Sequence, residues 1–517
     1  MIDFFLKRSL SRLEILKSNL TKLPRKIVHI KVYRNHAFEP MEGMLRKFLL
    51  VSGLQAEFSY SDYNDSFIFS ENHEDFDLYV IWIDFSHYTQ TNISVWFQER
   101  IRCLQAITSK PIFVYYIGLT HLNINGAAVE NANTIKQELK EAFYDSEKAE
   151  YLGTRLSAKA LVKIAQELGL KYFPSFFKTP LKVIIVDLDN TLYRGVLGED
   201  GIDNLVFNYA FQEQLKILKN EGVLLAIVSK NEYEDIYELF EKRKDFILKW
   251  NDFSIHHASW ESKAVVIEKI TKQFNVGLDS VLFIDDNPGE IHLVNQCLPD
   301  VHTLLADEEV CYKFNLYPLL ERYLITQEDT LRQSDIQASQ QRESLKKTLD
   351  VDNYFKQLKM TLSFSLDKQE HINRAIQLLN KANQFIFSFK RYSLGEIKSN
   401  QHILTISLKD ALSDSGIIGV IVASININQL KIDELVVSCR ALGRQIETIM
   451  LDTGFHYLSE QLKVTEGMLI DFVQGPRNTP AKVWLEQYTH CSISGNRLIE
   501  TKVKNIKPNS FIEVQFI

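Results

Sequence analysis

Two carboxylates follow directly after an apolar run in the middle of the chain. The segment VIIVDLDNT places Asp187 and Asp189 at the end of a predicted buried strand. In open α/β sheets, ligands bind beyond the carboxyl ends of the strands. There one carboxylate could attack a phosphorus atom, the other could donate and accept protons, and a magnesium ion between them would offset their repulsion. A helix cap or a surface acid pair is the alternative interpretation of this motif alone.

Three more motifs place polar groups at the ends of predicted elements further along the chain. The apolar run LLAIVSKN ends near Ser229, WESKAVV carries Lys263 at the start of a predicted helix, and SVLFIDDNP ends in Asp285 and Asp286. A phosphate held between Ser229, Lys263 and the amides of helix N-termini, over a metal held by Asp187 and Asp286, would form a phosphoryl-transfer site. The four motifs together therefore favour chemistry over a chance acid pair.

The elements that must position these groups begin with a first α/β region. Apolar and amphipathic runs predict its strands and helices, which are IVHIKVY, FEPMEGMLRKFLLVSG, DLYVIWID (77–84), PIFVYYIG (111–118) and SAKALVKIAQELG (157–169). Their alternation predicts a parallel, doubly wound sheet. Ahead of them, leucines at helical spacing between basic residues predict one basic amphipathic helix. These leucines are Leu6, Leu10, Leu13, Leu16 and Leu20.

The second region, which contains the acidic motifs, shows the same alternation of predicted strands and helices. We call it region two, and the part of the chain after the connector region three. A polar stretch without glycine or proline (327–347) then predicts a connecting helix. Region three mixes predicted helices with strands such as GIIGVIVASI and IDELVVSC, which favours an α+β fold. We therefore expect an α/β multidomain chain. Its predicted parts are a domain over 1–178, a domain over 179–325, a helical connector over 326–350 and a domain over 351–517.

Composition restricts the classes of protein that need to be considered. A chain of 517 residues with 45% hydrophobic and 24% charged residues is globular and long enough for about three domains. Its net charge of −7 argues against nucleic-acid binding. The five cysteines form no CxxC pair, which argues against a disulfide framework or a zinc site and favours a reducing cytoplasm. The longest apolar stretch is too short to span a membrane.

The four motifs, in this order, resemble those of the haloacid dehalogenase (HAD) phosphatase superfamily. By this resemblance Asp187 would be the nucleophile that forms an aspartyl-phosphate, and Asp189 would be the general acid/base. The groups that would bind the phosphoryl group are Ser229, Lys263, Asn190, Thr191 and Lys230. The residues that would form the magnesium site are Asp187, Asp189, Asp285 and Asp286. The short spans from Asp189 to Ser229 and from Lys263 to Asp285 leave no room for a large cap domain, so the site should be open or covered by a neighbouring domain.

Longer motifs resemble one subfamily, the FkbH-like proteins. DLDNTLYRGVLGEDG is similar to the family's DLDNTLWGGVIGEDG, and NRAIQLLNKANQFIFSFKRYS, SCRALGRQIE, NTPAKVWLEQY and TQEDTLRQ also match family patterns. The resemblance runs from about residue 180 to 490. It implies an enzyme that dephosphorylates 1,3-bisphosphoglycerate and loads the glyceryl unit onto the phosphopantetheine thiol of an acyl carrier protein. It also implies a first domain similar to a degenerate SGNH hydrolase. This region has no GDS or DxxH motif, so we expect it to cover the site or dock a partner.

Region three resembles the GNAT acyltransferase fold, in which a strand, an R/QxxGxG/A turn and a helix hold a pyrophosphate or pantetheine arm. Here the turn runs from Arg440 through Gly443 to Arg444, and Gln445 replaces the final small residue. That replacement argues against tight binding of coenzyme A but leaves room for a pantetheine arm. Cys439, just before the turn, is a candidate acyl acceptor because nearby arginines and a helix N-terminus can lower the pKa of a thiol. A buried, inert cysteine is the alternative.

An amide-rich predicted helix and two departures from the family complete the candidate pocket. Amides at helical spacing, from Asn373 to Gln384, could bind a pantetheine or acyl carbonyl, although capping or inter-domain hydrogen bonds would explain them equally well. Tyr193 and Arg194 replace the family's Trp-Gly, and Ile386 and Phe387 replace polar residues, so another acyl phosphate could be the substrate. The predicted substrate-binding and acyl-binding residues are Arg194, Asn231, Asn380, Asn383, Gln384, Arg391, Arg440, Gly443 and Arg444.

The leading hypothesis is a magnesium-dependent HAD-type enzyme that dephosphorylates a small phosphorylated acid and transfers its acyl unit to a carrier protein. A stand-alone phosphatase of a small metabolite with a non-catalytic GNAT-like domain is the second hypothesis. A scaffold that docks carrier proteins is the third, and the intact set of four motifs argues against it.

Overall fold

The structure is a computed structural model of the chain. It describes every residue except 1, 21–25, 70–75, 89–91, 148, 324–337, 339–341, 343–344, 346–348, 383, 393–396, 398–399, 439–440, 443, 445, 465–466, 476–477 and 504–510. The chain divides into two compact units. The first unit comprises Met1–Leu218, Leu225–Val266 and Leu278–Ile325, and the second comprises Lys219–Leu224, Ile267–Gly277 and Thr326–Ile517. The two sheets described first lie before residue 326 and the third lies after it.

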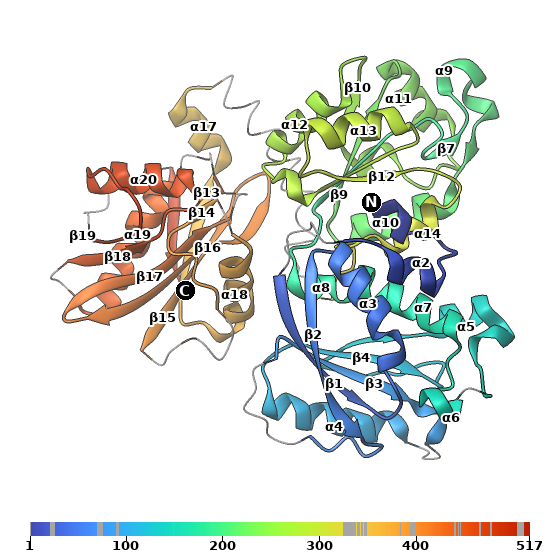
Figure 1. The fold of residues 1–517 in the computed structure, drawn as a ribbon. Helices are drawn as coiled ribbons and strands as arrows, with labels where there is room; N and C mark the ends of the chain where they lie inside the picture. Colours follow the sequence, from blue (N-terminus) through green and yellow to red (C-terminus); the bar gives the residue numbers. More distant parts are fainter. Residues whose placement is uncertain are drawn as a thin grey trace. The chain divides into compact units, whose positions relative to one another are not determined.

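The first sheet is parallel, in the order β2-β1-β3-β4-β5. Its strands are β1 (Lys26–Arg34), β2 (Leu54–Tyr63), β3 (Leu78–Asp84), β4 (Ile112–Ile117) and β5 (Ala128–Asn131). Every residue of β3 and β4 is buried, as their continuous apolar runs predict for central parallel strands. Helices cover both faces of this sheet (Figure 1), so the doubly wound arrangement is confirmed.

Two helix layers enclose this sheet. Helix α4 (Ile93–Ile107) packs Phe97, Ile101 and Leu104 against one face. Helices α3 (Glu39–Val51) and α7 (Ala158–Gln166) lie on the other. Both were predicted from their amphipathic patterns. A π-helical segment, Glu167–Tyr172, continues α7.

The prediction of one long basic helix at the N-terminus was wrong. The segment forms two short helices, α1 (Ile2–Phe5) and α2 (Arg12–Lys17). Ser11 separates them because it has extended backbone and caps α2, its side chain and that of Glu14 forming a reciprocal capping box. The predicted leucine face is therefore not continuous: Leu6 is fully buried, whereas Leu13 is 61% exposed.

The second sheet is also parallel, in the order β10-β9-β6-β11-β12. Its strands are β6 (Val183–Val186), β9 (Leu224–Ser229), β10 (Phe253–Ala258), β11 (Val281–Asp285) and β12 (His302–Leu305). All residues of the three central strands are buried. Because β6 lies between β9 and β11, the motifs that follow these three strands meet at one edge of the sheet.

Helices and a small hairpin connect the strands of this second sheet. The helices that follow the motif strands are α10 (Tyr209–Asn220), α11 (Tyr233–Lys242), α12 (Lys263–Gln273) and α13 (Pro288–Cys297). The hairpin pairs β7 (Tyr193–Arg194) with β8 (Val206–Phe207). It follows the first acidic motif directly and contains the Tyr193-Arg194 departure from the family pattern.

A group of buried carboxyls and tyrosines lies beside the first sheet. Tyr115 donates a hydrogen bond to Glu167 at 3.3 Å, and Tyr323 donates one to Glu130 at 3.5 Å. Burial raises the pKa of Glu167 to about 7, with Lys171 opposing the shift. Burial, followed by repulsion from Glu321, raises the pKa of Glu130 to about 7. These two acids therefore ionise at a cost to the folded state.

We expect the Glu167→Gln variant to be more stable than the wild type at pH 8. Because the folded pKa of Glu167 lies above its ordinary value of 4.5, the folded protein holds a proton between about pH 4.5 and 7 that the unfolded chain has released. Stability therefore falls as the pH rises through this window. Because a neutral amide does not ionise, we expect on the order of 1–2 kcal/mol of this pH-dependent loss of stability to be absent in the variant.

Urea unfolding at pH 5 and pH 8 measures this difference. Glu99→Gln, a change at an exposed position of α4, is the control. A loss of stability between the two pH values that is equal in the Glu167→Gln variant and the wild type would contradict the assignment.

The third sheet is mixed, with the order β19-β18-β17-β16-β15-β13-β20 and β14 paired to β17. Its strands are β13 (Met360–Leu366), β14 (Phe385–Ile386), β15 (Gln401–Lys409), β16 (Asp414–Asn426), β17 (Gln429–Val437), β18 (Met468–Phe472), β19 (Arg497–Thr501) and β20 (Ile512–Phe516). Its helices are α17 (Val351–Leu358), α18 (Ile372–Lys381), α19 (Glu447–Gln461) and α20 (Thr479–Thr489). Side chains of α18 pack on one face and those of α19 and α20 in the core on the other, which confirms an α+β arrangement.

Most of the predicted connector over 326–350 lies outside the described residues. Among those described, Arg342 is buried and forms a bidentate ion pair with Asp410, at 2.8 and 3.0 Å. Leu345 packs against the core of the third sheet. No helix within the described part of the chain is long and apolar enough to cross a membrane.

Candidate active site

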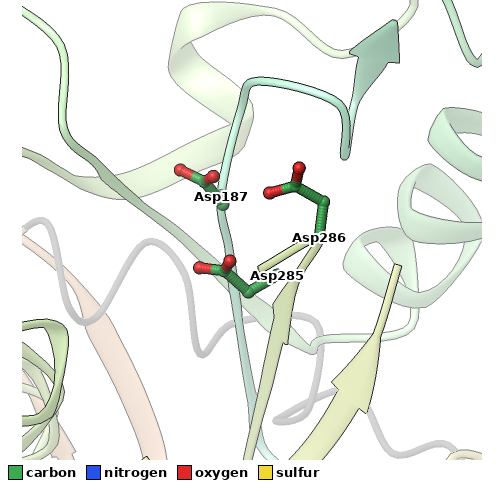
Figure 2. A group of neighbouring side chains, drawn as sticks. All are labelled: Asp187, Asp285 and Asp286. Carbon is green, nitrogen blue, oxygen red and sulfur yellow. The ribbon is translucent and has the colours of Figure 1, made fainter. Parts of the chain in front are cut away.

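Three carboxylates converge at the carboxyl ends of β6 and β11. Asp187 follows β6 directly, Asp285 ends β11 and Asp286 comes next. The strands are paired in parallel, and the amide of Asp187 donates to the carbonyl of Ile284 at 3.0 Å, so their ends are level. The three acids offer oxygen atoms within 4.8 Å of one another. Figure 2 shows the carboxylates turned toward a common space.

The buried Lys263 contacts two of these three acids. The Nζ atom of Lys263 lies 2.5 Å from Oδ2 of Asp285 and 3.1 Å from Oδ1 of Asp187. Lys263 begins α12, as predicted, and only 4% of it is exposed. Burial lowers its pKa, but attraction by Asp187 and then Asp285 outweighs burial, so the pKa is raised overall. The lysine is therefore held in its charged form.

Burial raises the pKa of two of the acids, whereas it lowers that of the lysine. Burial raises the pKa of Asp187 to about 7; Lys263 opposes the shift and Asp285 adds to it. Burial, then repulsion from Asp285, also raises the pKa of Asp286. One ammonium group is thus too little positive charge for three clustered carboxylates, and a further cation would favour their ionised forms.

The donor set fits a hard divalent cation such as Mg²⁺. All candidate ligands are carboxylate oxygens, the type that magnesium prefers. Oδ1 of Asp187 is buried and accepts no well-formed hydrogen bond from the described residues, its contact with Lys263 being the ion pair at 3.1 Å. A buried oxygen left in this way is available to a metal ion.

Asp189, predicted as a fourth magnesium ligand, is not part of this carboxylate group. Tyr193 donates to its Oδ1 at 2.7 Å and the amide of Leu197 at 3.0 Å, while Asn231 donates to its Oδ2 at 2.9 Å. These three donors come from the hairpin, the turn after it and the loop after β9. They fix the orientation of the carboxyl group, which suits proton transfer better than metal binding through its side chain.

The predicted phosphate-binding residues surround the carboxylates at the same sheet edge. Ser229 ends β9, is buried, and accepts a hydrogen bond from Asn231 at 2.9 Å. The Thr191 hydroxyl is buried without a hydrogen-bond partner among the described residues. Asn190 has a positive φ of 51° and accepts a hydrogen bond from the amide of Gly195 at 3.0 Å. These contacts shape the turn after β6 and leave two hydroxyl groups beside it.

Two predicted residues at this edge have other surroundings. The ammonium group of Lys230 forms an ion pair with Glu290 at the start of α13. Arg194 ends β7, opposite Val206 of β8, and both residues are exposed. Its guanidinium group is thus open to solvent.

Of the residues predicted to line an acyl-binding pocket in region three, Asn380, Arg391 and Arg444 have structural partners. Asn383, Cys439, Arg440 and Gly443 lie outside the described residues, so these predictions stand untested. Arg444 is 5% exposed and lies 3.4 Å from Asp410, the partner of the connector's Arg342. The helix that carries the amides ends at Lys381, so Gln384 does not share its face as predicted.

The loop after α18 is tied back to that helix by two of the predicted residues. The side chain of Asn380 donates to the carbonyl of Tyr392 at 2.8 Å and accepts from its amide at 3.1 Å. Arg391 donates to the carbonyl groups of Leu379 and Ala382, at 2.7 and 3.4 Å. Both contacts match the capping alternative, because they satisfy the helix end and its following loop.

The strand before the predicted turn is already paired on both sides near its end. β17 pairs with β18 only over Leu430–Ile432, and β14 pairs with its last residues. The buried carboxylate of Glu434 accepts hydrogen bonds from the amides of Phe387, Ser388 and Lys390, at 2.8–3.0 Å. The backbone of β17 therefore has no open edge beside the turn for an extended ligand.

Sequence reasoning missed three residues that organise these sites: Tyr193, Glu290 and Glu434. Tyr193 was noted only as a departure from the family, and its hydroxyl proves to hold Asp189. Glu290 follows the DDNP motif at the third helical position, where a carboxylate favours a helix N-terminus, so it resembled an ordinary capping residue. Glu434 lies inside an apolar strand, and a buried charge there was a signal that the pattern contained.

Comparisons with known proteins found similarity only among solved structures. No family model matches the chain, and no curated protein matches it. The N-terminal part of protein BF1531 from Bacteroides fragilis, which contains a phosphatase domain complexed with Mg, has 22% identity and a TM-score of 0.47, over 60% of this chain and 98% of that one.

Two other solved structures are more distant. The 3-deoxy-D-manno-octulosonate 8-phosphate phosphatase of Moraxella catarrhalis, in complex with magnesium, phosphate and KDO, has 18% identity and a TM-score of 0.18, over 23% of this chain and 64% of that one. The N-acetylglutamate synthase of Neisseria gonorrhoeae, complexed with coenzyme A and L-arginine, has 9% identity and a TM-score of 0.19, over 92% of this chain and 96% of that one.

We expect Mg²⁺ to stabilise the protein through Asp286. A ligand that binds only the folded state at about 100 times its Kd adds about 2.7 kcal/mol of stability. Removing one of three carboxylates in Asp286→Asn should abolish most of that gain. Thermal unfolding with and without Mg²⁺ measures it, with Asp203→Asn at an exposed position as the control. An equal Mg²⁺-dependent rise in Tm in the Asp286→Asn variant would show that the ion binds elsewhere.

Proposed function

We propose that the chain is a magnesium-dependent phosphatase of the HAD type that acts on a small phosphorylated metabolite. The cluster of Asp187, Asp285 and Asp286, in which the first two acids contact the buried Lys263, carries this proposal. Ser229 at the end of the adjacent strand supports it, since a phosphoryl group needs donors opposite the nucleophile. The order of the four motifs, which resembles that superfamily, is consistent with the same site.

In this proposal a carboxylate oxygen of Asp187 attacks the phosphorus atom and forms an aspartyl-phosphate. The bond from phosphorus to the leaving oxygen breaks, and Asp189 gives that oxygen a proton. Asp189 then takes a proton from water, whose oxygen attacks phosphorus and releases inorganic phosphate and Asp187. Lys263 and Ser229 stabilise the negative charge on the phosphoryl oxygens. Magnesium, when bound by the three acids, would offset the repulsion between the nucleophile and the phosphate.

We expect Asp187→Asn to lose at least about 1,000-fold in the rate of phosphate release, because the amide cannot act as the nucleophile. Asp189→Asn should also be strongly impaired, since it can neither give nor take the proton. Phosphate release from a panel that includes acetyl phosphate, sugar phosphates and 1,3-bisphosphoglycerate checks this in the presence of Mg²⁺. Asp203→Asn should retain wild-type rates. A panel on which wild-type and Asp187→Asn proteins act equally would refute the assignment.

A finer proposal follows from the FkbH-like motifs between about residues 180 and 490. In it the substrate is an acyl phosphate similar to 1,3-bisphosphoglycerate, and the glyceryl or other acyl unit passes to the phosphopantetheine thiol of an acyl carrier protein. The thiolate of Cys439 would attack the acyl carbon, form a thioester and release the acyl phosphate group as inorganic phosphate, and the carrier thiol would then displace Cys439. The Asp187 site would remove only the other phosphate, a monoester, because attack on the phosphorus of the acyl phosphate would leave an unactivated acid. The exposed Arg194 could contact the acid group of the donor. The stand-alone phosphatase and the carrier-docking scaffold remain as the competing hypotheses.

Intact mass spectrometry separates these hypotheses. We expect the protein, Mg²⁺, 1,3-bisphosphoglycerate and a phosphopantetheinylated carrier protein to yield a glyceryl adduct on the carrier, which Asp187→Asn abolishes. A transient adduct on the enzyme that Cys439→Ala removes would support the thioester relay. Phosphate release without any protein adduct would favour the stand-alone phosphatase. If the Asp187→Asn variant formed the same amount of adduct, the acyl transfer would not depend on this site.

A further inference from the structure

One ion pair joins the loops on either side of the proposed site, across the space beyond the end of β6, which we call its mouth. Lys230 follows Ser229 in the loop after β9, and Glu290 lies in the first turn of α13, after β11. Strand β6 separates these two strands in the sheet. Neighbouring strands are about 4.8 Å apart, so the two loops start roughly 10 Å from each other. A contact between them therefore passes over the end of β6, where Asp187 lies.

The two partners of this ion pair differ in their surroundings. Nζ of Lys230 donates a hydrogen bond to Oε1 of Glu290. The lysine side chain is 40% exposed, whereas the glutamate side chain is 12% exposed. The second carboxylate oxygen, Oε2, is buried without a hydrogen-bond partner in the described part of the chain. Glu290 is thus held in place by packing, while the long lysine stem is free to change direction.

Lys230 is also the cation next in sequence to Ser229, which the proposed function assigns to the phosphoryl group. A phosphate dianion at Ser229 would compete with Glu290 for the same ammonium group. An ammonium group has three N–H donors and can contact two anions at once, as Lys263 does with Asp187 and Asp285. Ser229 ends β9 and Glu290 follows β11, however, on opposite sides of β6, so a phosphate at Ser229 would draw the ammonium group of Lys230 away from Glu290. Binding of phosphate should therefore weaken the ion pair.

We propose that Glu290 is a positioning residue that holds Lys230 across the mouth in the substrate-free protein and yields it to the incoming phosphoryl group. This inference rests on the proposed phosphatase site and adds a competing internal anion to it. Glu290 weakens the binding of phosphate and thereby favours its release after hydrolysis. Lys230 is the residue through which it acts.

Calorimetric titration with inorganic phosphate, in excess Mg²⁺, tests this without requiring turnover. The variants are Glu290→Gln, Glu290→Asp, Lys230→Ala and the double variant Lys230→Ala/Glu290→Gln. Glu238→Gln, which loses a comparable surface ion pair to Lys242 on α11, is the matched control. Circular dichroism confirms that each variant is folded.

We expect Glu290→Gln to bind phosphate about threefold to fivefold more tightly, the range of a partly exposed ion pair. Glu290→Asp, which keeps the charge, should stay near the wild type, and Lys230→Ala should bind more weakly. In the Lys230→Ala background, Glu290→Gln should change nothing. With a hydrolysed substrate, KM and the inhibition constant of phosphate should both fall in Glu290→Gln, while kcat does not rise.

The contrary results are equally definite. An unchanged or weaker phosphate affinity in Glu290→Gln, or the same gain in the Lys230→Ala background, would overturn the role of Glu290 while leaving a phosphatase that depends on Asp187 intact. If neither the wild type nor any variant binds phosphate, and none releases it from a substrate, the proposed function and this inference fail together.

Discussion

The balance between one buried ammonium group and three carboxylates governs the site. Lys263 keeps Asp187 and Asp285 together at the end of an apolar sheet, where burial opposes the ionisation of Asp187. Neither partner would be tolerable alone, because an unpaired buried charge is costly. The pairing still leaves negative charge in excess. This excess is what makes the place suitable for a divalent cation and then for a phosphoryl group beside it.

The strands and loops of the second sheet hold these charged groups in position. The buried central strands carry the acids and Ser229 to a single edge, and the hairpin after β6 brings Tyr193 back onto Asp189. Asn231 joins the serine to the same carboxylate. The carboxylate of Asp189, the proposed general acid/base, is thus oriented by residues from two loops, while the proposed nucleophile stays near the lysine. The different surroundings separate the roles of two acids that lie two residues apart.

The third sheet shows how polar residues can resemble a binding pocket in sequence and yet serve the fold. Arg444 joins Asp410, Asn380 joins the backbone of Tyr392, and Arg391 satisfies the end of α18. Each of these side chains has a buried or partly buried partner that could not be predicted from the local sequence pattern. Cys439, Arg440 and Gly443, on which the acyl-transfer proposal depends, lie outside the described part of the chain.

Much of the architecture follows from the sequence alone. Continuous apolar runs determined β3, β4, β6, β9 and β11, because strands buried on both faces require them. The acids at the ends of β6 and β11 could be expected to meet, since parallel strands end at a common edge. The break at Ser11 was also contained in the capping pattern, although the leucine spacing obscured it.

Only the tertiary structure decided which charges are partners. It paired Lys263 with two acids, left the Asp189 side chain outside the cluster of three carboxylates and placed Glu290 opposite Lys230. Pairings of this kind depend on the order of strands in the sheet and on the depth of each side chain. The periodicity of a sequence reports which residues are buried, but it carries no information about which distant residues they face.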